Sequence, residues 1–385
     1  MAWLKADLGM DKIRVLHCLE TIGSGGVEQT RLSLVKCLDS SRYEQRIICT
    51  KAIGGLPELF QQEGCEIVEV GEFEKVFDFE RYRRAAAAVK DFKPHIIHGA
   101  VFEGVNMAAI VGRRCSVPVI IGEETSDPQN RSWKGSLLYR FLVFFIHHMV
   151  AVSPAVERYL RNKIFVPKYK VTMVANGVAE KPAPASEEVV CLRKELGISD
   201  SDFVIGTVGR LFDEHKRVSD LLRAFEMLLE HSANAKLLIV GTGPDEDMLK
   251  TMAKNLGVLN RVIFAGYQVN TRIYYELMDV FCLPSAFEAF GLVLVEAMYA
   301  GVPIVATRTG GIPKVVVENE TALLSPPFDP KVLSHNILKL YTSSELRDKF
   351  SVAGLARARR EFSEDRYVSD IDTLYTRLLS ERGLI

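Results

Sequence analysis

Short runs of apolar and β-branched residues alternate with longer helical patterns along almost the whole chain. In the first half these runs are KIRVLHCL, EQRIICT, CEIVEV, PHIIHGA, PVIIGE, HMVAVS and KVTMVAN, and a helical pattern begins at about Val27. Such alternation predicts parallel strands that are joined by crossover helices. Nearly continuous apolar runs such as IIHGA further predict strands that are buried on both faces of a sheet.

The alternation is interrupted between Gly177 and Asp202, where prolines, small residues and charged residues come together. A second series follows with FVIGTVGR, AKLLIVGTG, RVIFAG, VFCLPS, PIVAT and ALLSPP, and 385 residues suffice for two cores. We predict an α/β chain of two tandem, doubly wound, Rossmann-like domains: residues 1–180, a linker of 181–201, residues 202–363, and a closing helical segment of 364–385. Ligands bind at the carboxyl ends of the strands in such sheets, so we expect the active site in a cleft between the two facing domains.

The composition excludes several classes of protein. The formal net charge is −1, with 48% hydrophobic and 25% charged residues, as in a globular protein without the positive field that collects nucleic acid. The start MAWLKADLGMDKIRVL does not resemble a secretory signal, and the longest apolar run, Phe141 to Val152, is too short to cross a bilayer. The seven cysteines are scattered without a C-x-x-C pair, so neither disulfides nor structural zinc are expected. We therefore expect a cytoplasmic protein that binds no nucleic acid.

The segment FEAFGLVLVE carries two glutamates, Glu288 and Glu296, separated by seven residues with Gly291 between them. It follows the strand-like VFCLPS, and a helix is predicted to begin near Gly291. Free amides and the positive end of a helix beside a glycine suit a diphosphate, and Glu296, one turn further on, suits neighbouring hydroxyls such as those of a ribose. As isolated residues, the two glutamates would instead be a helix cap and a solvated helix residue.

The longer string PSAFEAFGLVLVEAMYAGVPIVATRTGGIP closely resembles the donor-binding segment of glycosyltransferase family 4, whose members are retaining enzymes of the GT-B fold. The resemblance implies that Glu288 binds the hydroxyls of the donor sugar and that Glu296 holds the ribose. It also implies that Gly291 and Leu292 offer amides to the diphosphate, and it places Phe290 in the donor-binding set.

A second element, GTVGRLFDEHKRVSDLLRAF, has a strand that ends at Gly209, followed by Arg210 and, before a helix, by Lys216. Two cations at a strand end can clamp a diphosphate, although an arginine and a lysine in a surface loop would also be unremarkable. Family members carry an arginine and a lysine at similar places. The local insertion FDEHKR leaves His215 close to the lysine position, and we choose Lys216.

In the first half, GSGGVEQTRLSLV resembles the glycine-rich turn of the family, where a glycine closes over the donor phosphates and sugar. We assign this role to Gly26, with Gly25 as the alternative. A dinucleotide-dependent oxidoreductase would also be Rossmann-like, but GSGGVE lacks the G-x-G-x-x-G spacing of a dinucleotide site.

The residue beside the reacting carbon departs from the family pattern. Many relatives carry a histidine six residues after the proline of this strand, whereas PVIIGEETSD places Glu124 there. Glu124 is a candidate for binding the acceptor or orienting the sugar, and pairing with a loop arginine is the alternative. His98, at the end of PHIIH, is interpreted as a structural histidine rather than a ligand.

Asp-x-Asp strings at 200–202, 245–247 and 370–372 raise the question of a metal that holds the diphosphate. They fall in a linker, in the acidic first turn of a helix and in a helical stretch. Because cations and helix ends can replace a metal here, we expect no metal and no cofactor besides the donor substrate.

The stretch RSWKGSLLYRFLVFFIHH, from Arg131 to His148, mixes cations and tryptophan with a strongly apolar helix. Two interpretations stay open. The helix packs in the core against the following strand, or it contacts a membrane surface, which would add a peripheral site at the inner membrane.

Together these features predict a retaining glycosyltransferase that moves a hexosyl or N-acetylhexosaminyl group from a nucleoside-diphosphate sugar, preferably a UDP-sugar. The acceptor would be a glycan, lipid-linked or small-molecule hydroxyl. Glu288, Arg210, Lys216 and Glu124 form the catalytic set, and the resemblance implies that the final helix crosses back onto the N-terminal domain. The alternatives are a GDP-mannose-dependent mannosyltransferase and a non-catalytic scaffold of the same fold.

Overall fold

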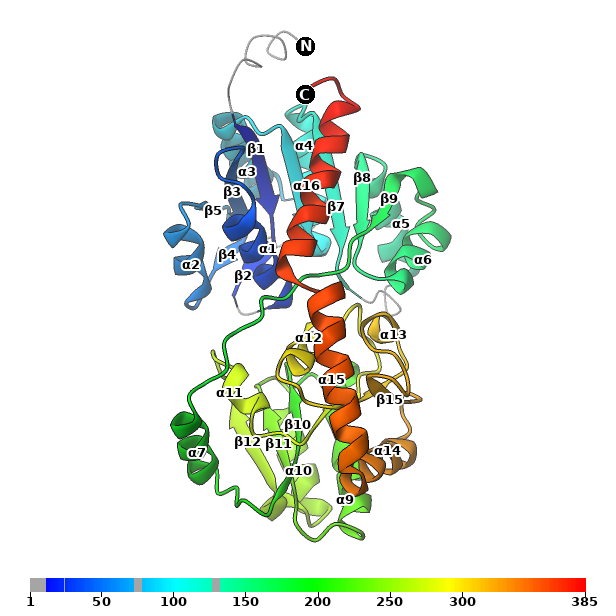
Figure 1. Cartoon of the computed structure of the whole chain (residues 1–385). Helices are drawn as coiled ribbons and strands as arrows, with labels where there is room; N and C mark the ends of the chain where they lie inside the picture. The colour runs from blue at the N-terminus through cyan, green and yellow to red at the C-terminus, as the bar shows by residue number, and fades with distance from the viewer. Residues whose placement is uncertain (1–11, 24, 73–77, 127–131) are drawn as a thin grey trace. The chain divides into compact units, whose positions relative to one another are not determined.

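The computed structural model describes residues 12–23, 25–72, 78–126 and 132–385, and the chain divides into two compact units (Figure 1). Unit one comprises Met1–Gly177 together with Glu364–Ile385, and unit two comprises Val178–Ser363. The segment 181–201, expected as a linker, belongs to unit two and contains helix α7 (Ser186–Glu195).

Unit one is built on a parallel sheet of seven strands in the order β5-β3-β1-β6-β7-β8-β9. The strands are β1 (Ile13–Cys18), β3 (Tyr43–Cys49), β5 (Glu66–Glu69), β6 (Ile96–Ala100), β7 (Val119–Glu124), β8 (His148–Ala151) and β9 (Val171–Met173). Every residue of β6 and β7 is buried, as expected for central strands covered by helices on both faces. Two short strands, β2 (Thr21–Ile22) and β4 (Lys51–Ala52), form a separate parallel pair that the sequence pattern did not indicate.

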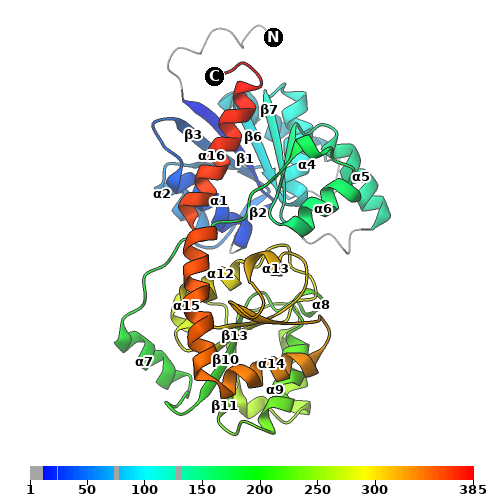
Figure 2. The same cartoon turned by 45° about the vertical axis from the view of Figure 1, so that its right-hand side comes forward.

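Seven helices of unit one lie within the described residues. They are α1 (Gly26–Cys37), α2 (Leu56–Gln62), α3 (Phe79–Phe92), α4 (Val101–Arg114), α5 (Trp133–Val143), α6 (Pro154–Asn162) and α16 (Glu364–Ser380). In both views α16 runs beside α1 along one face of the sheet (Figures 1 and 2). It buries Tyr367, Ile371 and Leu374 against a core that includes Val15 and Ile96. The last residues of the chain are therefore part of the first hydrophobic core.

Unit two repeats the architecture with a parallel sheet of six strands in the order β12-β11-β10-β13-β14-β15. The strands are β10 (Phe203–Val208), β11 (Ala235–Val240), β12 (Val262–Gly266), β13 (Val280–Leu283), β14 (Ile304–Thr307) and β15 (Ala322–Ser325). Besides α7, its helices are α8 (Asp213–Lys216), α9 (Val218–Leu229), α10 (Glu246–Asn255), α11 (Arg272–Tyr275), α12 (Leu292–Tyr299), α13 (Ile312–Val315), α14 (Pro330–Thr342) and α15 (Ser344–Glu361). The predicted fold of two doubly wound α/β units is confirmed.

The direction of strand order reverses once in each sheet, between β1 and β6 in unit one and between β10 and β13 in unit two. The loops that leave these neighbouring strands diverge to opposite faces, so they leave room for a ligand at the carboxyl ends of the strands. The segments after β10 and β13 are those in which the sequence predicts the donor site. No helix in the described part of the chain is long and apolar enough to span a membrane.

Candidate functional site

The reversal point of unit two brings the two predicted donor-binding segments to one edge of the sheet. Strand β10 is followed by Gly209 and the exposed Arg210, and neighbouring β13 is followed by the turn that leads to Glu288. The amide of Gly209 donates to the carbonyl of Val240 at 3.0 Å, so the hydrogen bonding between β10 and β11 extends one residue beyond the end of β10. Arg210 therefore directly follows a residue whose backbone is hydrogen-bonded to the sheet.

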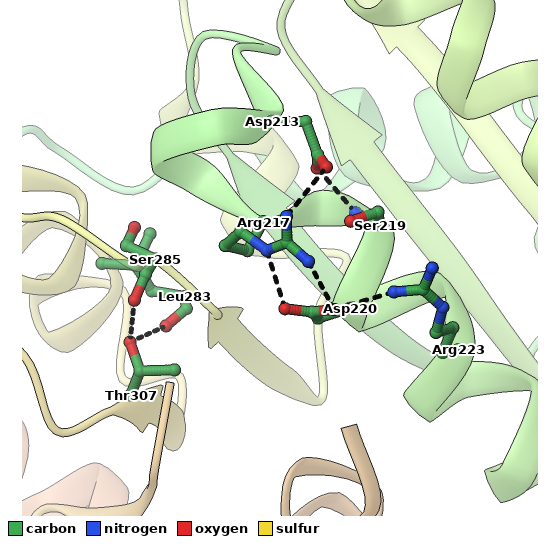
Figure 3. A network of polar contacts seen from close by, with 8 residues as sticks. All are labelled: Asp213, Arg217, Ser219, Asp220, Arg223, Leu283, Ser285 and Thr307. Atoms are coloured by element: carbon green, nitrogen blue, oxygen red, sulfur yellow. Dashed lines mark hydrogen bonds and ion pairs between the residues drawn. The ribbon is translucent and has the colours of Figure 1, made fainter. Parts of the chain in front are cut away.

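The short helix α8 carries Lys216 and is held by a network of charges that Figure 3 shows. The carboxylate of Asp213 accepts the amide of Ser219 at 2.8 Å. Arg217 follows α8 with a left-handed φ of 51°, and its guanidinium donates to Asp220 at 2.8 and 3.0 Å. These hydrogen bonds to Asp220 raise the pKa of Arg217. The network fixes the turn between α8 and α9, directly after Lys216.

The turn after β13 is fixed from the neighbouring strand β14. The hydroxyl of Thr307 donates to the carbonyl of Ser285 at 2.5 Å and lies 3.5 Å from that of Leu283 (Figure 3). The amide of Ala286 donates to the carbonyl of His215 at 2.8 Å, so this turn is also tied to α8.

His215 and Lys216 point in different directions from α8. The His215 ring packs between Phe212 and Phe287, with ring centroids 4.9 and 5.5 Å away. The Lys216 ammonium instead reaches Glu288, with Nζ 2.6 Å from Oε2. Of the two residues that competed for the lysine role, Lys216 is the one that the structure brings to Glu288.

The Lys216–Glu288 pair joins a cation and a carboxylate that are both largely buried. The hydroxyl of Ser285 lies 3.4 Å from the same carboxylate oxygen. A pair of this kind can bind a ligand that offers hydroxyls to the carboxylate and anionic oxygens to the ammonium. A sugar attached to a phosphate is such a ligand.

Helix α12 begins beside this pair. Its N-cap, Gly291, has φ 97° and ψ 62°, and an added Cβ would stand 2.9 Å from Leu294. Glycine adopts this left-handed conformation readily. As at the start of any α-helix, the first amides of α12, beginning with Leu292, have no partners inside the helix. Such amides and the helix dipole favour an anion.

The side chain of Phe290 is buried and packs edge-on against Phe362, with ring centroids 5.6 Å apart. In this structure the side chain packs in the core, although the sequence placed the residue in the donor-binding set. On the same segment, the carbonyl of Glu288 accepts the amide of Gly311 at 2.7 Å, and a Cβ at Gly311 would lie 2.0 Å from the carbonyl oxygen of Ala289. The two loops therefore approach each other at backbone contact.

Glu296, on α12, accepts hydrogen bonds from Tyr275 at 3.0 Å and Thr271 at 3.3 Å. The pKa of Tyr275 is raised, mainly because its hydroxyl is buried and also because the carboxylate of Glu296 lies beside it. A pocket lies here, lined by Ala179, Lys181, Thr271, Arg272, Tyr275, Glu296 and Tyr299. Tyr275 was not predictable from the sequence, because an aromatic residue in a helical segment gives no sign of a carboxylate that lies 21 positions away.

In unit one, Gly26 is the exposed first residue of α1, and Glu124 is the buried last residue of β7. Ser126 donates both its amide, at 3.2 Å, and its hydroxyl to the carboxylate of Glu124. The sequence predicted neither this contact nor the neighbouring cluster around Glu123.

Glu123 forms a fully buried ion pair with Arg31 of α1. His98 lies against both, 3.3 Å from each, and its Nδ1 is 2.7 Å from the hydroxyl of Tyr375 on α16. Burial and the charge of Arg31 lower the pKa of His98 to about 4. Burial opposes ionisation of Glu123, but Arg31 and His98 outweigh it and lower the pKa to about 2. His98 is a neutral, buried part of the core, as its structural interpretation predicts.

Comparison with known proteins matches each half of the chain to a glycosyltransferase family model. Residues 25–177 match the glycosyl transferase 4-like domain, and residues 191–357 match glycosyl transferases group 1. The chain is 31% identical to N-acetyl-alpha-D-glucosaminyl L-malate synthase of Bacillus anthracis over 220 residues, and this alignment covers 57% of each protein. The matched part spans little more than half the length of this relative.

Longer matches agree. The chain is 25% identical over 367 residues to the lipopolysaccharide core biosynthesis glycosyltransferase LpsD of Rhizobium meliloti, covering 93% of this chain and 97% of the relative. Among solved structures, Anabaena Alr3699/HepE in complex with UDP and glucose has the same fold, with a TM-score of 0.85, 19% identity, and coverage of 94% of this chain and 99% of that one.

Proposed function

Since the chain belongs to the GT-B glycosyltransferases of the group 1 and 4-like families, we propose that it is a retaining hexosyltransferase. It moves a hexosyl or N-acetylhexosaminyl group from a nucleoside-diphosphate sugar, with a UDP-sugar as the first choice, to a hydroxyl acceptor. The observation that carries this proposal is the pairing of Lys216 with Glu288 at 2.6 Å, beside the start of α12 and at the strand-order reversal of unit two.

In this proposal the diphosphate lies over the first amides of α12, at Gly291 and Leu292, with Arg210 and Lys216 as cations. Glu288 then exchanges its bond with Lys216 for bonds with hydroxyls of the sugar. The charge of the diphosphate is offset by two side-chain cations and a helix dipole, so the proposed reaction uses no metal.

Glu296 takes the ribose in this arrangement. Its Oε2 is already engaged by Tyr275 and Thr271, so the carboxylate is oriented before the nucleotide arrives. A carboxylate accepts several hydrogen bonds at once, and two neighbouring ribose hydroxyls are suitable donors.

The bond between the anomeric carbon and the phosphate oxygen breaks as the acceptor oxygen bonds to the same face of that carbon. The proton of the acceptor hydroxyl passes to the departing phosphate oxygen, so no nucleophile from the protein is needed. Lys216, Arg210 and the start of α12 stabilise the charge that develops on the leaving group. For unit one, the family resemblance supports a role of Gly26 in donor binding and of Glu124 in binding the acceptor or orienting the sugar.

The names of similar proteins support this proposal at the level of class. The Anabaena structure holds UDP and glucose, the Bacillus anthracis relative is named for an N-acetylglucosaminyl product, and the Rhizobium meliloti relative is named for lipopolysaccharide core biosynthesis. A glycan, a lipid-linked glycan and a small molecule therefore all stand as acceptor classes. A GDP-mannose donor is the alternative that the experiment below distinguishes.

The test is a thermal-shift and hydrolysis screen of the purified chain with UDP-, GDP- and ADP-sugars, without added metal. Stabilisation by one donor should be lost in Lys216→Ala and Glu296→Ala, and loss of one contact to the leaving group should lower turnover by roughly 100-fold. Lys339→Ala and Glu226→Ala remove exposed charges elsewhere in unit two and should behave like the parent. Binding of GDP-mannose alone would replace the UDP assignment. Binding that survives both site variants would refute the site.

A further inference from the structure

Helix α5 presents an apolar stripe to the outside of unit one. Trp133, Leu137, Phe141 and Phe144 are 73, 57, 56 and 79% exposed. At 3.6 residues per turn, these four positions fall within an arc of about 80° on the helix surface. In Figure 1, α5 lies beyond β8 and β9 at the edge of the unit.

The opposite side of α5 packs into the protein. Tyr139 and Leu142 are fully buried, and Val143 is nearly so. Packing in the core, the first of the two interpretations that the sequence left open, therefore applies to one face of α5 and leaves the other face exposed. Exposing an apolar side chain to water is unfavourable in free energy, so four such side chains on one face indicate a surface that binds another molecule or a membrane.

The stripe continues onto the segment that follows α6. The Arg140 guanidinium lies 4.3 Å from the centre of the Phe165 ring and donates to the carbonyl of Lys163 at 2.7 Å. Phe165 is itself exposed, as is Tyr169 four residues later. We call Trp133, Leu137, Phe141, Phe144 and Phe165 the aromatic face.

The charge around the aromatic face is one-sided. The chain as a whole has a net charge of −1, but residues 132–173 contain one acidic residue, Glu157. The cations in the same segment are Lys134, Arg140, Arg158, Arg161, Lys163, Lys168 and Lys170. The segment that carries the exposed tryptophan and phenylalanine side chains therefore has an excess of positive charge, and two of its cations contact the aromatic face directly: Lys134 lies 5.7 Å from the centre of the Trp133 ring, and Arg140 lies over Phe165.

We propose that the aromatic face docks on the surface of an anionic lipid bilayer. Tryptophan and phenylalanine insert at the boundary of headgroups and acyl chains, and lysine and arginine pair with anionic headgroups. A second copy of the same face would bring like charges together, so charge complementarity favours an anionic surface over a symmetric dimer. This docking does not depend on the donor site, because it uses other residues and needs no nucleotide.

The chain offers its own reporter for the test. It has two tryptophans, Trp3 and Trp133, so Trp3→Phe leaves Trp133 as the sole tryptophan, which can be excited selectively. With vesicles of phosphatidylcholine and phosphatidylglycerol, the chain should sediment with the lipid and the emission of Trp133 should shift to the blue. Pure phosphatidylcholine vesicles should bind much less, and added salt should weaken binding to the mixed vesicles.

Two variants separate the apolar and electrostatic parts. Phe141→Ser with Phe144→Ser should lower the partition coefficient by roughly 100-fold, about tenfold for each ring. Lys168→Gln with Lys170→Gln should lower it by about 25-fold on anionic vesicles. Phe79→Ser removes an equally exposed phenylalanine from α3 of the same unit and should bind as the parent does.

Absence of binding to anionic vesicles would overturn the proposal, as would unchanged binding of the double phenylalanine variant. A lipid-free dimer that this variant dissociates, seen by sedimentation velocity, would assign the aromatic face to a second copy of the chain instead. In either case the donor screen above can still succeed, so failure of this proposal is distinguishable from failure of the proposed function.

Discussion

The buried ion pair of Arg31 and Glu123 permits a perturbation whose size follows from its burial. In Arg31→Met the side-chain length is kept and the charge is lost, which leaves the carboxylate of Glu123 buried without its cation. Breaking a buried pair from one side costs about 3–5 kcal/mol. Such a loss is a large part of the roughly 5–15 kcal/mol by which a domain is usually stable.

Removing both charges should cost less than removing one. In Arg31→Met with Glu123→Leu neither residue buries an uncompensated charge, and apolar replacements of buried pairs are often close to neutral. We expect the double variant to recover at least about 2 kcal/mol relative to the sum of the single losses, which is the usual scale of coupling between contacting residues.

Urea unfolding followed by far-ultraviolet circular dichroism, together with the fluorescence of Trp133 in unit one, measures these differences. Arg42→Met is the matched control: it removes an arginine that pairs with Asp372 of α16 in a half-exposed position, and such pairs contribute about 0–1 kcal/mol. The reasoning fails if Arg31→Met costs no more than Arg42→Met, or if the single losses of Arg31 and Glu123 simply add.

Three further outcomes are expected. The folded pKa of His98, about 4, lies below its unfolded value of about 6.5, so the unfolded chain binds the extra proton. His98 alone should therefore account for a loss of about 3 kcal/mol of stability as pH falls from about 6.5 to 4, and His98→Gln should flatten the slope of the urea midpoint in this window. The lowered pKa values of His17, His147 and His148 act in the same direction, so part of the slope should remain in this variant. Gly291→Ala places a side chain at φ 97° and should lower the melting temperature and weaken donor binding. Gly257→Ala, at φ 71° in open space, should cost backbone strain of about 1–2 kcal/mol without changing donor affinity. Equal donor affinity in both variants would contradict this expectation. Tyr275→Phe frees the carboxylate of Glu296 and should raise the KM for the donor roughly tenfold with little change in kcat, and an unchanged KM in initial-rate kinetics would exclude the positioning role.

Much of the fold was predictable because the decisive signals are local. Strands such as IIHGA are apolar without interruption, and their burial on both sides follows from that pattern alone. The start of α12 was equally predictable, because Gly291 separates a strand-and-turn segment from a run of helix-forming residues. The sequence also indicated, from the local order of elements, that Arg210 and Lys216 follow one strand and that Glu288 follows another.

The site itself required distances that no local pattern contains. Lys216 and Glu288 are 72 positions apart, and they meet because β10 and β13 are neighbours in the sheet. The sequence left His215 as a rival of Lys216, and only the tertiary structure shows that the His215 ring packs between two phenylalanines while Lys216 reaches Glu288.

The exposed side of α5 and the buried cluster around Arg31 show the limit most clearly. A helix as apolar as α5 is compatible with full burial, and its exposure depends on how much of it the neighbouring elements cover. An arginine on an amphipathic helix is ordinarily solvated, and Arg31 is buried because Glu123 and the α16 residue Tyr375, from distant parts of the chain, converge on the same place. By itself the sequence determined most of the segments that become strands and helices, with β2, β4 and α7 as exceptions, since those preferences act over a few residues. The tertiary structure alone decided which charges are paired and which apolar faces are left uncovered, since these depend on long-range packing.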